Sequence, residues 1–120
     1  MNKRDMANMY SNYLRSEGYA PKIDDDGDVI FKYEGRTYLI MPDERDQQFF
    51  RLIFPNFWSI ESEAERQKVL AAAGHATGLT KVGKVYIMRD STWASVEIFL
   101  ASPDHFSAVF TRSLFDLVLT

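Results

Sequence analysis

The sequence contains no cysteine among its 120 residues, which excludes disulfide bonds, thiolate metal ligands and a thiol nucleophile. It also lacks long apolar runs and an apolar N-terminal stretch, so we expect no membrane span, no signal peptide and a cytoplasmic location. Basic residues are scattered and the net charge is −3. Because binding to nucleic acid needs a basic stripe, we do not expect a nucleic-acid partner.

Apolar and aromatic side chains, in contrast, are plentiful. Hydrophobic residues make up 46% of the chain and aromatic residues 14%. That content is ample for one hydrophobic core in a chain of this length. We find no linker, repeat or low-complexity segment, and we therefore predict a single domain over residues 1–120.

Two segments in the first two thirds of the chain have the apolar spacing of amphipathic helices. The first covers residues 3–17 and ends at Gly18. The second begins with a Ser-x-x-Glu capping-box pattern at Ser62 and ends near Gly78. Its buried stripe would consist of the small residues Val69, Ala72, Ala73 and Ala76. Small side chains would let this helix approach a sheet closely.

A third helix is predicted from Ser102 towards Thr120, with Ser102 as N-cap and Pro103 at the first helical position. Its core stripe would comprise Phe106, Val109, Phe110, Leu114, Leu117 and Val118. Ala108, Phe115 and Leu119 lie about half a turn away. A helix that is apolar on two sides is either sandwiched within the protein or bound to a partner.

Four strands are predicted before the second helix, at residues 19–23, 29–33, 36–41 and 49–54. The second and third flank Glu34-Gly35, which reads as a two-residue hairpin loop. In that register Phe31 lies opposite Tyr38. The fourth strand should stop at Pro55, because proline cannot donate to a ladder.

Residues 81–100 form the clearest hairpin of the sequence. With Asp90-Ser91 as its turn, Arg89 pairs with Thr92 and successive side chains alternate between two faces. The core face holds Val85, Ile87, Ala94 and Val96. The outer face holds Met88 beside Trp93, Tyr86 beside Ser95, Lys84 beside Glu97 and Val82 beside Phe99. This mixture is typical of an association surface. The alternative is that a terminus or loop of the same chain covers it.

The candidate interaction surface therefore combines the outer face of the hairpin with the second side of the third helix. Its residues are Tyr86, Met88, Trp93, Phe99, Phe115 and Leu119. Phe57 and Trp58 are a third place where apolar surface could be left over. For these two we expect packing onto the core at the corner between strand and helix.

One acidic run is a candidate cation site. Asp24-Asp-Asp-Gly-Asp28 carries clustered carboxylates, which suit hard cations. An EF-hand loop opening at Asp24 would need glycine at its sixth position and an acid at its twelfth, where the chain has Val29 and Gly35. We therefore expect an acidic turn and no metal site.

Catalytic motifs are also missing from the sequence. His75 and His105 have no companion at metal-binding spacing. The serines have no nucleophile elbow, and no glycine-rich loop joins a strand to a helix. We therefore predict a protein that is not an enzyme, with no catalytic residue and no cofactor.

Several motifs match a known family. They are Gly18-Tyr19, Asp26-Gly-Asp-Val29, Phe31, Gly35, Tyr38-Leu-Ile40, Lys84-Val-Tyr86 and Trp93-Ala-Ser-Val-Glu-Ile-Phe99, followed by an amphipathic helix. On these motifs nearly the whole chain resembles the YbjN-like family of small bacterial proteins, linked loosely to sensory regulation or stress responses. The resemblance implies an α+β fold similar to the class I type III secretion chaperones, often dimeric. Some members of that wider group bind extended client segments, and no catalytic residues are assigned in the family.

The expected architecture is a curved antiparallel sheet of about five to six strands with three helices, in the order α-β-β-β-β-α-β-β-α. The expected function is a non-enzymatic protein-interaction module, chaperone-like or regulatory, forming a homodimer and binding a client or regulatory protein. The alternative is a small-molecule-binding sensor whose pocket is lined by aromatic residues such as Phe31, Tyr38, Phe50 and Trp58.

Overall fold

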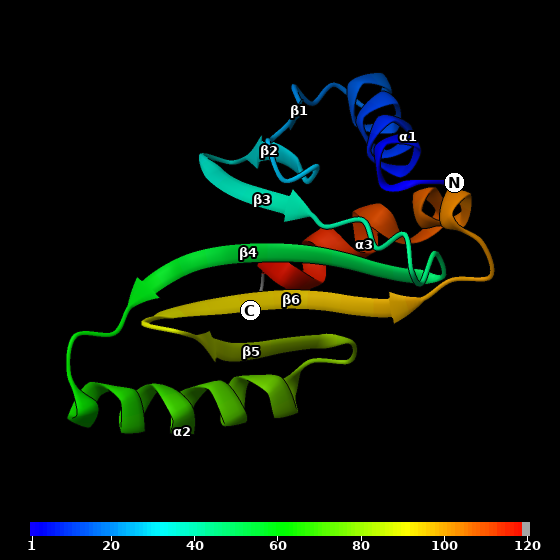
Figure 1. The fold of residues 1–120 in the computed structure, drawn as a ribbon. Coiled ribbons are helices and arrows are strands. Elements are labelled where there is room, and N and C mark those ends of the chain that lie inside the picture. The colour runs from blue at the N-terminus through cyan, green and yellow to red at the C-terminus, as the bar shows by residue number, and fades with distance from the viewer. Residues whose placement is uncertain (119–120) are drawn as a thin grey trace.

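The computed structural model describes residues 1–118 as an α+β fold with one six-stranded antiparallel sheet and three α-helices (Figure 1). The predicted fold class and element order are confirmed. The elements are α1 (Lys3–Ser16), β1 (Lys22–Ile23), β2 (Val29–Tyr33), β3 (Arg36–Ile40), β4 (Phe49–Ser59), α2 (Glu63–Leu79), β5 (Gly83–Met88), β6 (Ser91–Phe99), a short 3-10 turn (Pro103–His105) and α3 (Phe106–Val118).

The long strands β4 and β6 form the middle of the sheet, whose order is β1-β2-β3-β4-β6-β5. Figure 1 shows α3 passing behind β4, while α2 runs beside the edge strand β5. Helix α1 packs on the same side of the sheet as α3, since its Tyr10 contacts Phe50 of β4 and Phe106 of α3. The side of β4, β6 and β5 towards the viewer has no helix on it. Within residues 1–118, no helix is long and apolar enough to cross a membrane.

The core is an aromatic layer between the sheet and helices α1 and α3. Tyr10 of α1 meets Phe106 edge-to-face with ring centroids 4.7 Å apart. Phe110 of α3 lies 5.8 Å from the ring of Phe31 on β2. Such tilted and edge-to-face pairs are favourable because the positive ring edge meets the negative face of its neighbour. These contacts bind both helices to the same side of the sheet.

Two local signals shape the first third of the chain. Helix α1 starts at Asn2, whose side chain accepts a hydrogen bond from the Asp5 backbone N–H at 2.8 Å. The first hairpin turns at Glu34 (φ 50°) and Gly35 (φ 79°), with Phe31 opposite Tyr38 as predicted. Two consecutive positive φ angles give the turn whose twist matches that of the strands.

The second hairpin is paired two residues away from the predicted register. Its turn is Arg89-Asp90, with Arg89 at φ 59°, and Met88 lies opposite Ser91. Arg66 of α2 donates to the Asp90 carboxylate at 2.9 Å, a tertiary contact that fixes the turn. Because the side-chain period of a strand is two, this shift changes the partners but leaves the residues within β5 and β6 on their predicted faces.

Strand β4 is also longer than predicted, because the ladder continues past Pro55 to Ser59. Pairing with β6 shifts between Phe54 and Trp58, where Asn56 has φ 52°. An irregularity of this kind lets proline lie within a strand, since the bulged residue needs no ladder hydrogen bond. The first strand, by contrast, is reduced to Lys22–Ile23.

Helix α2 covers the edge of the sheet at β5. The Thr77 hydroxyl accepts from the Val85 N–H at 2.9 Å and donates to the Val85 carbonyl at 3.3 Å. Thr80 donates to the Gly83 carbonyl at 2.6 Å. These hydroxyls occupy the backbone groups that a further strand would use, which blocks edge-to-edge pairing.

Replacing Thr77 by valine should therefore destabilise the protein. Thr77→Val keeps the shape of the side chain but leaves the Val85 N–H and C=O without their partner. We expect the free energy of unfolding to fall by about 1–3 kcal/mol, the cost of unsatisfied polar groups. Urea unfolding measures this loss, with Thr37→Val, at an exposed position of β3, as control. Equal unfolding midpoints for Thr77→Val and the parent would contradict the role given to Thr77.

A second polar anchor joins α1 to the acidic turn. Asp28 is only 6% exposed, and its Oδ1 lies 3.4 Å from Lys3 Nζ. Burial raises the pKa of the Asp28 carboxyl above its usual value, and the opposing attraction of Lys3 is the smaller effect. The ionised carboxylate is therefore less favourable in the folded protein than in the unfolded chain.

The raised pKa of Asp28 predicts how the stability of the protein depends on pH. A carboxyl whose pKa is raised by folding stabilises the protein below its unfolded pKa, and that stabilisation is lost as pH rises through the folded pKa. Asp28→Asn should therefore unfold at higher urea than the parent at pH 7, with the difference shrinking in mild acid. Asp25→Asn, an exposed change in the same turn, is the control. A less stable Asp28→Asn variant at pH 7 would show that the Lys3 ion pair dominates.

Candidate protein-binding surfaces

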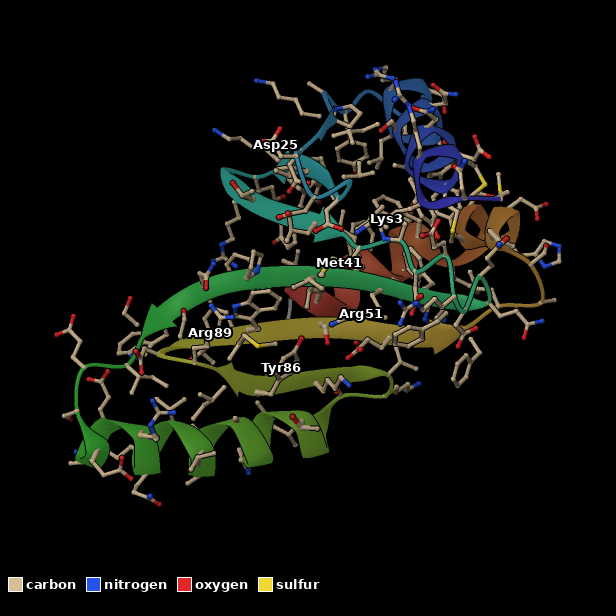
Figure 2. The ribbon with its side chains drawn as sticks, in the orientation of Figure 1. Lys3, Asp25, Met41, Arg51, Tyr86 and Arg89 are labelled. Carbon is tan, nitrogen blue, oxygen red and sulfur yellow. The ribbon has the colours of Figure 1, made fainter. Side chains whose placement is uncertain are left out.

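The helix-free side of the sheet carries a mixed surface, here named the open face. It is formed by alternate residues of three neighbouring strands, and Figure 2 labels two of them, Arg51 and Tyr86. The members are Phe49, Arg51 and Ile53 on β4, Trp93, Ser95, Glu97 and Phe99 on β6, and Lys84, Tyr86 and Met88 on β5. Of these, Ile53 and Ser95 are fully buried. No helix among residues 1–118 covers this face.

The centre of the open face is a charge cluster around Glu97. Its Oε1 lies 3.1 Å from Arg51 Nε and its Oε2 lies 2.5 Å from Lys84 Nζ. The Ser95 hydroxyl donates to Oε2 at 2.8 Å. The Glu97 side chain is only 11% exposed, whereas that of Lys84 is 49% exposed. One carboxylate is therefore shared by two cations.

One end of the open face is aromatic. Tyr86 and Trp93 are directly opposite each other, with ring centroids 6.4 Å apart. The indole N–H of Trp93 donates to Asn56 Oδ1 at 2.9 Å, and Met88 beside them is exposed. The Tyr86 hydroxyl is buried without a hydrogen-bond partner among the described residues. An amphipathic aromatic pair of this kind is common at interfaces.

The other end of the open face is formed by Phe49 and Phe99, whose rings lie 5.6 Å apart. The Arg51 guanidinium lies 5.8 Å from the centroid of the Phe49 ring. Phe99 is 76% exposed, an unusual state for a large apolar side chain. The open face thus has an apolar group on each side of its charged centre.

The six residues of the predicted interaction surface do not form one surface. Tyr86, Met88, Trp93 and Phe99 share the open face, as expected. Phe115 lies on the opposite, helix-bearing side, where it lines a cavity beside α3. Leu119 lies outside the described residues.

A second apolar surface, the helix-side patch, surrounds Phe115. It consists of Leu79, Val82 and Phe115, all exposed, around a cavity of about 490 Å³. Lys81 and Arg112 also line this cavity. The sequence did not single out Leu79, which belongs to no periodic stripe. Val82 was predicted on the outer face of the hairpin, and that prediction was wrong, because Val82 precedes β5 and lines the cavity beside Phe115. Only their position beside α3 brings them together with Phe115.

The small residues along one side of α2 were predicted to be buried, and this prediction was wrong for most of them. Only Ala73 is buried, while Val69 and Ala76 are half-buried and Ala72 is exposed. Helix α2 leans against β5 alone and does not cross the sheet. A groove therefore remains between α2 and the end of β4.

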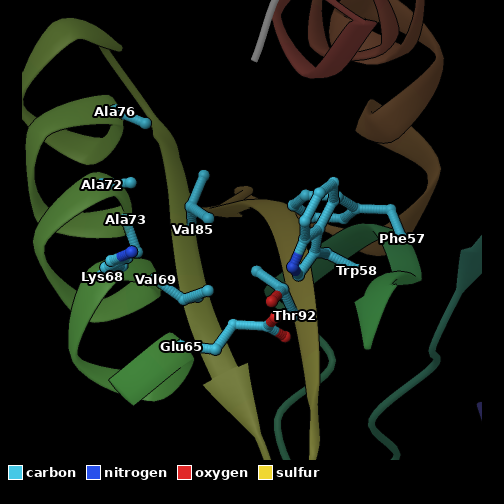
Figure 3. Close-up of a pocket in the computed structure, with 10 residues that line it drawn as sticks. All are labelled: Phe57, Trp58, Glu65, Lys68, Val69, Ala72, Ala73, Ala76, Val85 and Thr92. Carbon is cyan, nitrogen blue, oxygen red and sulfur yellow. The ribbon is translucent and has the colours of Figure 1, made fainter. Parts of the chain in front are cut away.

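This groove, of about 440 Å³, is shown in Figure 3. Phe57 and Trp58 lie across from α2, with Val85 and Thr92 between. The expectation that Phe57 and Trp58 pack onto the core was wrong: Trp58 is 57% exposed, and Phe57 is exposed and stacks on Phe54 at 5.2 Å. Beyond the bulge at Pro55, β4 carries both rings away from α1 and α3.

The acidic run forms a turn, as predicted. Asp24 Oδ1 accepts the backbone N–H groups of Asp26 and Asp28 at 3.0 Å and 2.9 Å. Carboxylate oxygens of Asp24, Asp26 and Asp28 come within 4.8 Å of one another. Lys3 already places a cation beside them, at 3.4 Å from Asp28. The turn therefore gives no support to a metal site, whose absence remains a prediction.

Comparison with known proteins shows the fold and no family. No family model and no curated protein matches the chain. A chain of the structure titled "Structure of the HopA1-SchA Chaperone-Effector Complex" matches with a TM-score of 0.64 and 15% sequence identity, covering 99% of this chain and 93% of that one. This likeness confirms the chaperone-like fold expected from the sequence, while membership of the YbjN-like family stays a prediction.

Proposed function

We propose that this protein is a non-enzymatic protein-binding module, chaperone-like or regulatory in role, whose open face takes a segment of another chain. The open face carries the proposal, because Tyr86, Trp93 and Met88 lie on a sheet surface that no described helix covers. The fold likeness to a chain of a chaperone–effector complex supports it.

The chemistry of the open face suits protein binding better than catalysis. Tyr, Trp, Met and Arg are the residue types enriched in protein interfaces. Aromatic side chains near the middle of an interface contribute most of the binding energy when a partner excludes water from them. The open face is a broad sheet surface; two of the described cavities lie beside α2 and α3, and a third lies at its Met88–Trp93 end, next to the Arg89-Asp90 turn.

Homodimerisation is the second part of the proposal, and we assign it to the helix-side patch. Leu79, Val82 and Phe115 are three exposed large apolar side chains in one place. A two-fold axis beside them would pair each residue with the same patch of a second copy, as in most homodimers. The open face would then remain free for a partner.

Binding can be tested by selecting a phage-displayed library of short random peptides on the immobilised protein. We expect enriched peptides that bind the parent and lose at least about tenfold in affinity for Trp93→Asp, since a charge would replace an interface aromatic. Leu70→Asp, an exposed change on the outer side of α2, is the matched control and should bind like the parent. The absence of enriched peptides, or equal binding by Trp93→Asp, would contradict the proposal.

The dimer can be tested by light scattering over a dilution series. We expect a dimeric parent, a monomeric Phe115→Asp variant and a dimeric Trp93→Asp variant, because the charge at residue 115 would be buried in the helix-side patch. Circular dichroism checks that each variant is folded. A monomeric parent would exclude the dimer while leaving peptide binding to its own test.

A small-molecule sensor is the second candidate function, and the groove beside α2 is the observation that favours it. Phe31, Tyr38 and Phe50 are fully buried in the core, so of the four predicted pocket residues only Trp58 lines the groove. A ligand there should raise the melting temperature of the parent saturably across a metabolite panel. Ala76→Leu, which fills the groove, should abolish the shift. A panel without any shift would contradict a ligand of the tested classes.

A further inference from the structure

The charge cluster of the open face specifies what a bound segment should carry, and this inference rests on the proposed function. Two cations, Arg51 and Lys84, surround the single carboxylate of Glu97. We infer that the partner segment presents an aspartate or glutamate over this cluster, with apolar side chains before and after it.

The charge cluster has more hydrogen-bond donors than its one carboxylate can accept. Both Glu97 oxygens are occupied, Oε1 by Arg51 and Oε2 by Lys84 and Ser95. An arginine has five N–H donors and a lysine three, so these contacts use only part of what the two cations offer. No other carboxylate among the described residues pairs with Arg51 or Lys84. The cluster therefore has donors to spare and an excess of one positive charge.

A partner that covers the charge cluster must offset the free energy of removing water from it. Lys84 is half exposed, so water now solvates its ammonium group. A partner that covers the open face removes this water, and a buried charge is costly unless it is paired. A carboxylate from the partner would pair the excess cation and accept the spare N–H groups. An apolar or basic residue in that place would oppose binding.

A second copy of this chain is the alternative occupant of the open face. Two open faces that meet centre to centre would bring together two clusters of the same excess charge, which repel. An offset pairing would lay the apolar ends of one copy on the charged centre of the other. Neither arrangement supplies the missing carboxylate. A heterologous acidic segment fits better.

The apolar ends of the open face indicate where the acidic residue should lie within the partner segment. At a rise of about 3.3 Å per residue, Glu97 lies roughly 13 Å along β6 from Trp93 and about 7 Å from Phe99. An extended segment lying along β6 would therefore contact apolar side chains on both sides of its acidic residue. The expected pattern is apolar, acidic, apolar.

Peptides enriched by the parent protein in the phage selection test this pattern directly. We expect an aspartate or glutamate between apolar residues in most peptides that require Trp93. For one such peptide, replacing its acid by the matching amide should weaken binding to the parent by roughly tenfold, the value of a charge-assisted hydrogen bond. The same replacement should have a much smaller effect on binding to Lys84→Gln, as expected in a double-mutant cycle when the two groups interact.

Lys32→Gln, which removes an exposed lysine from β2, is the matched control and should bind both peptides like the parent. Peptides that require Trp93 but carry no acid, or an amide replacement with the same effect on parent and Lys84→Gln, would overturn the inference while leaving the proposed function intact. A selection without any enriched peptide would instead count against the proposed function itself.

Discussion

The aromatic layer under α1 and α3 is the constraint on which the rest of the structure depends. Tyr10 and Phe106 meet edge-to-face at 4.7 Å, and Phe110 of α3 contacts Phe31 of the sheet. Because both helices bury their apolar stripes on one side, the hydrophobic demand of the domain is met there. The opposite side of β4, β6 and β5 is then free to carry charges and exposed aromatic residues, which a buried side could not accept.

Both edges of the sheet are covered in part, one by α2 and the other by the short strand β1. On one side Thr77 and Thr80 of α2 bond the outward backbone groups of Val85 and Gly83. On the other side β1 is only two residues long. Short or covered edges prevent chains from pairing strand to strand. The partner that we propose would therefore meet side chains on the open face or the helix-side patch more readily than a free strand edge.

Local patterns sufficed to predict the element order and the faces of the strands. They did not predict the register of the second hairpin or the exposure of the residues after Pro55. Glu34-Gly35 predicted its hairpin because the turn chemistry lies within two residues. The second register could not be predicted, since Arg89 is an uncommon residue at positive φ and Arg66 holds the turn from another element. The exposure of Phe57 and Trp58 depends on where α2 docks, which no local pattern encodes. Four of the six predicted surface residues nevertheless share one face, because the period of two survives a two-residue shift.

The charge cluster interrupts the apolar surface of the open face. Without Arg51, Lys84 and Glu97, the Tyr86–Trp93 end and the Phe49–Phe99 end would join into one apolar surface of the kind that associates without selectivity. Charges placed inside an apolar surface oppose such association, since an unmatched partner would bury them unpaired. In the proposed function, the same three residues would limit which chains can bind. Selectivity would then follow from the cost of burying an excess positive charge.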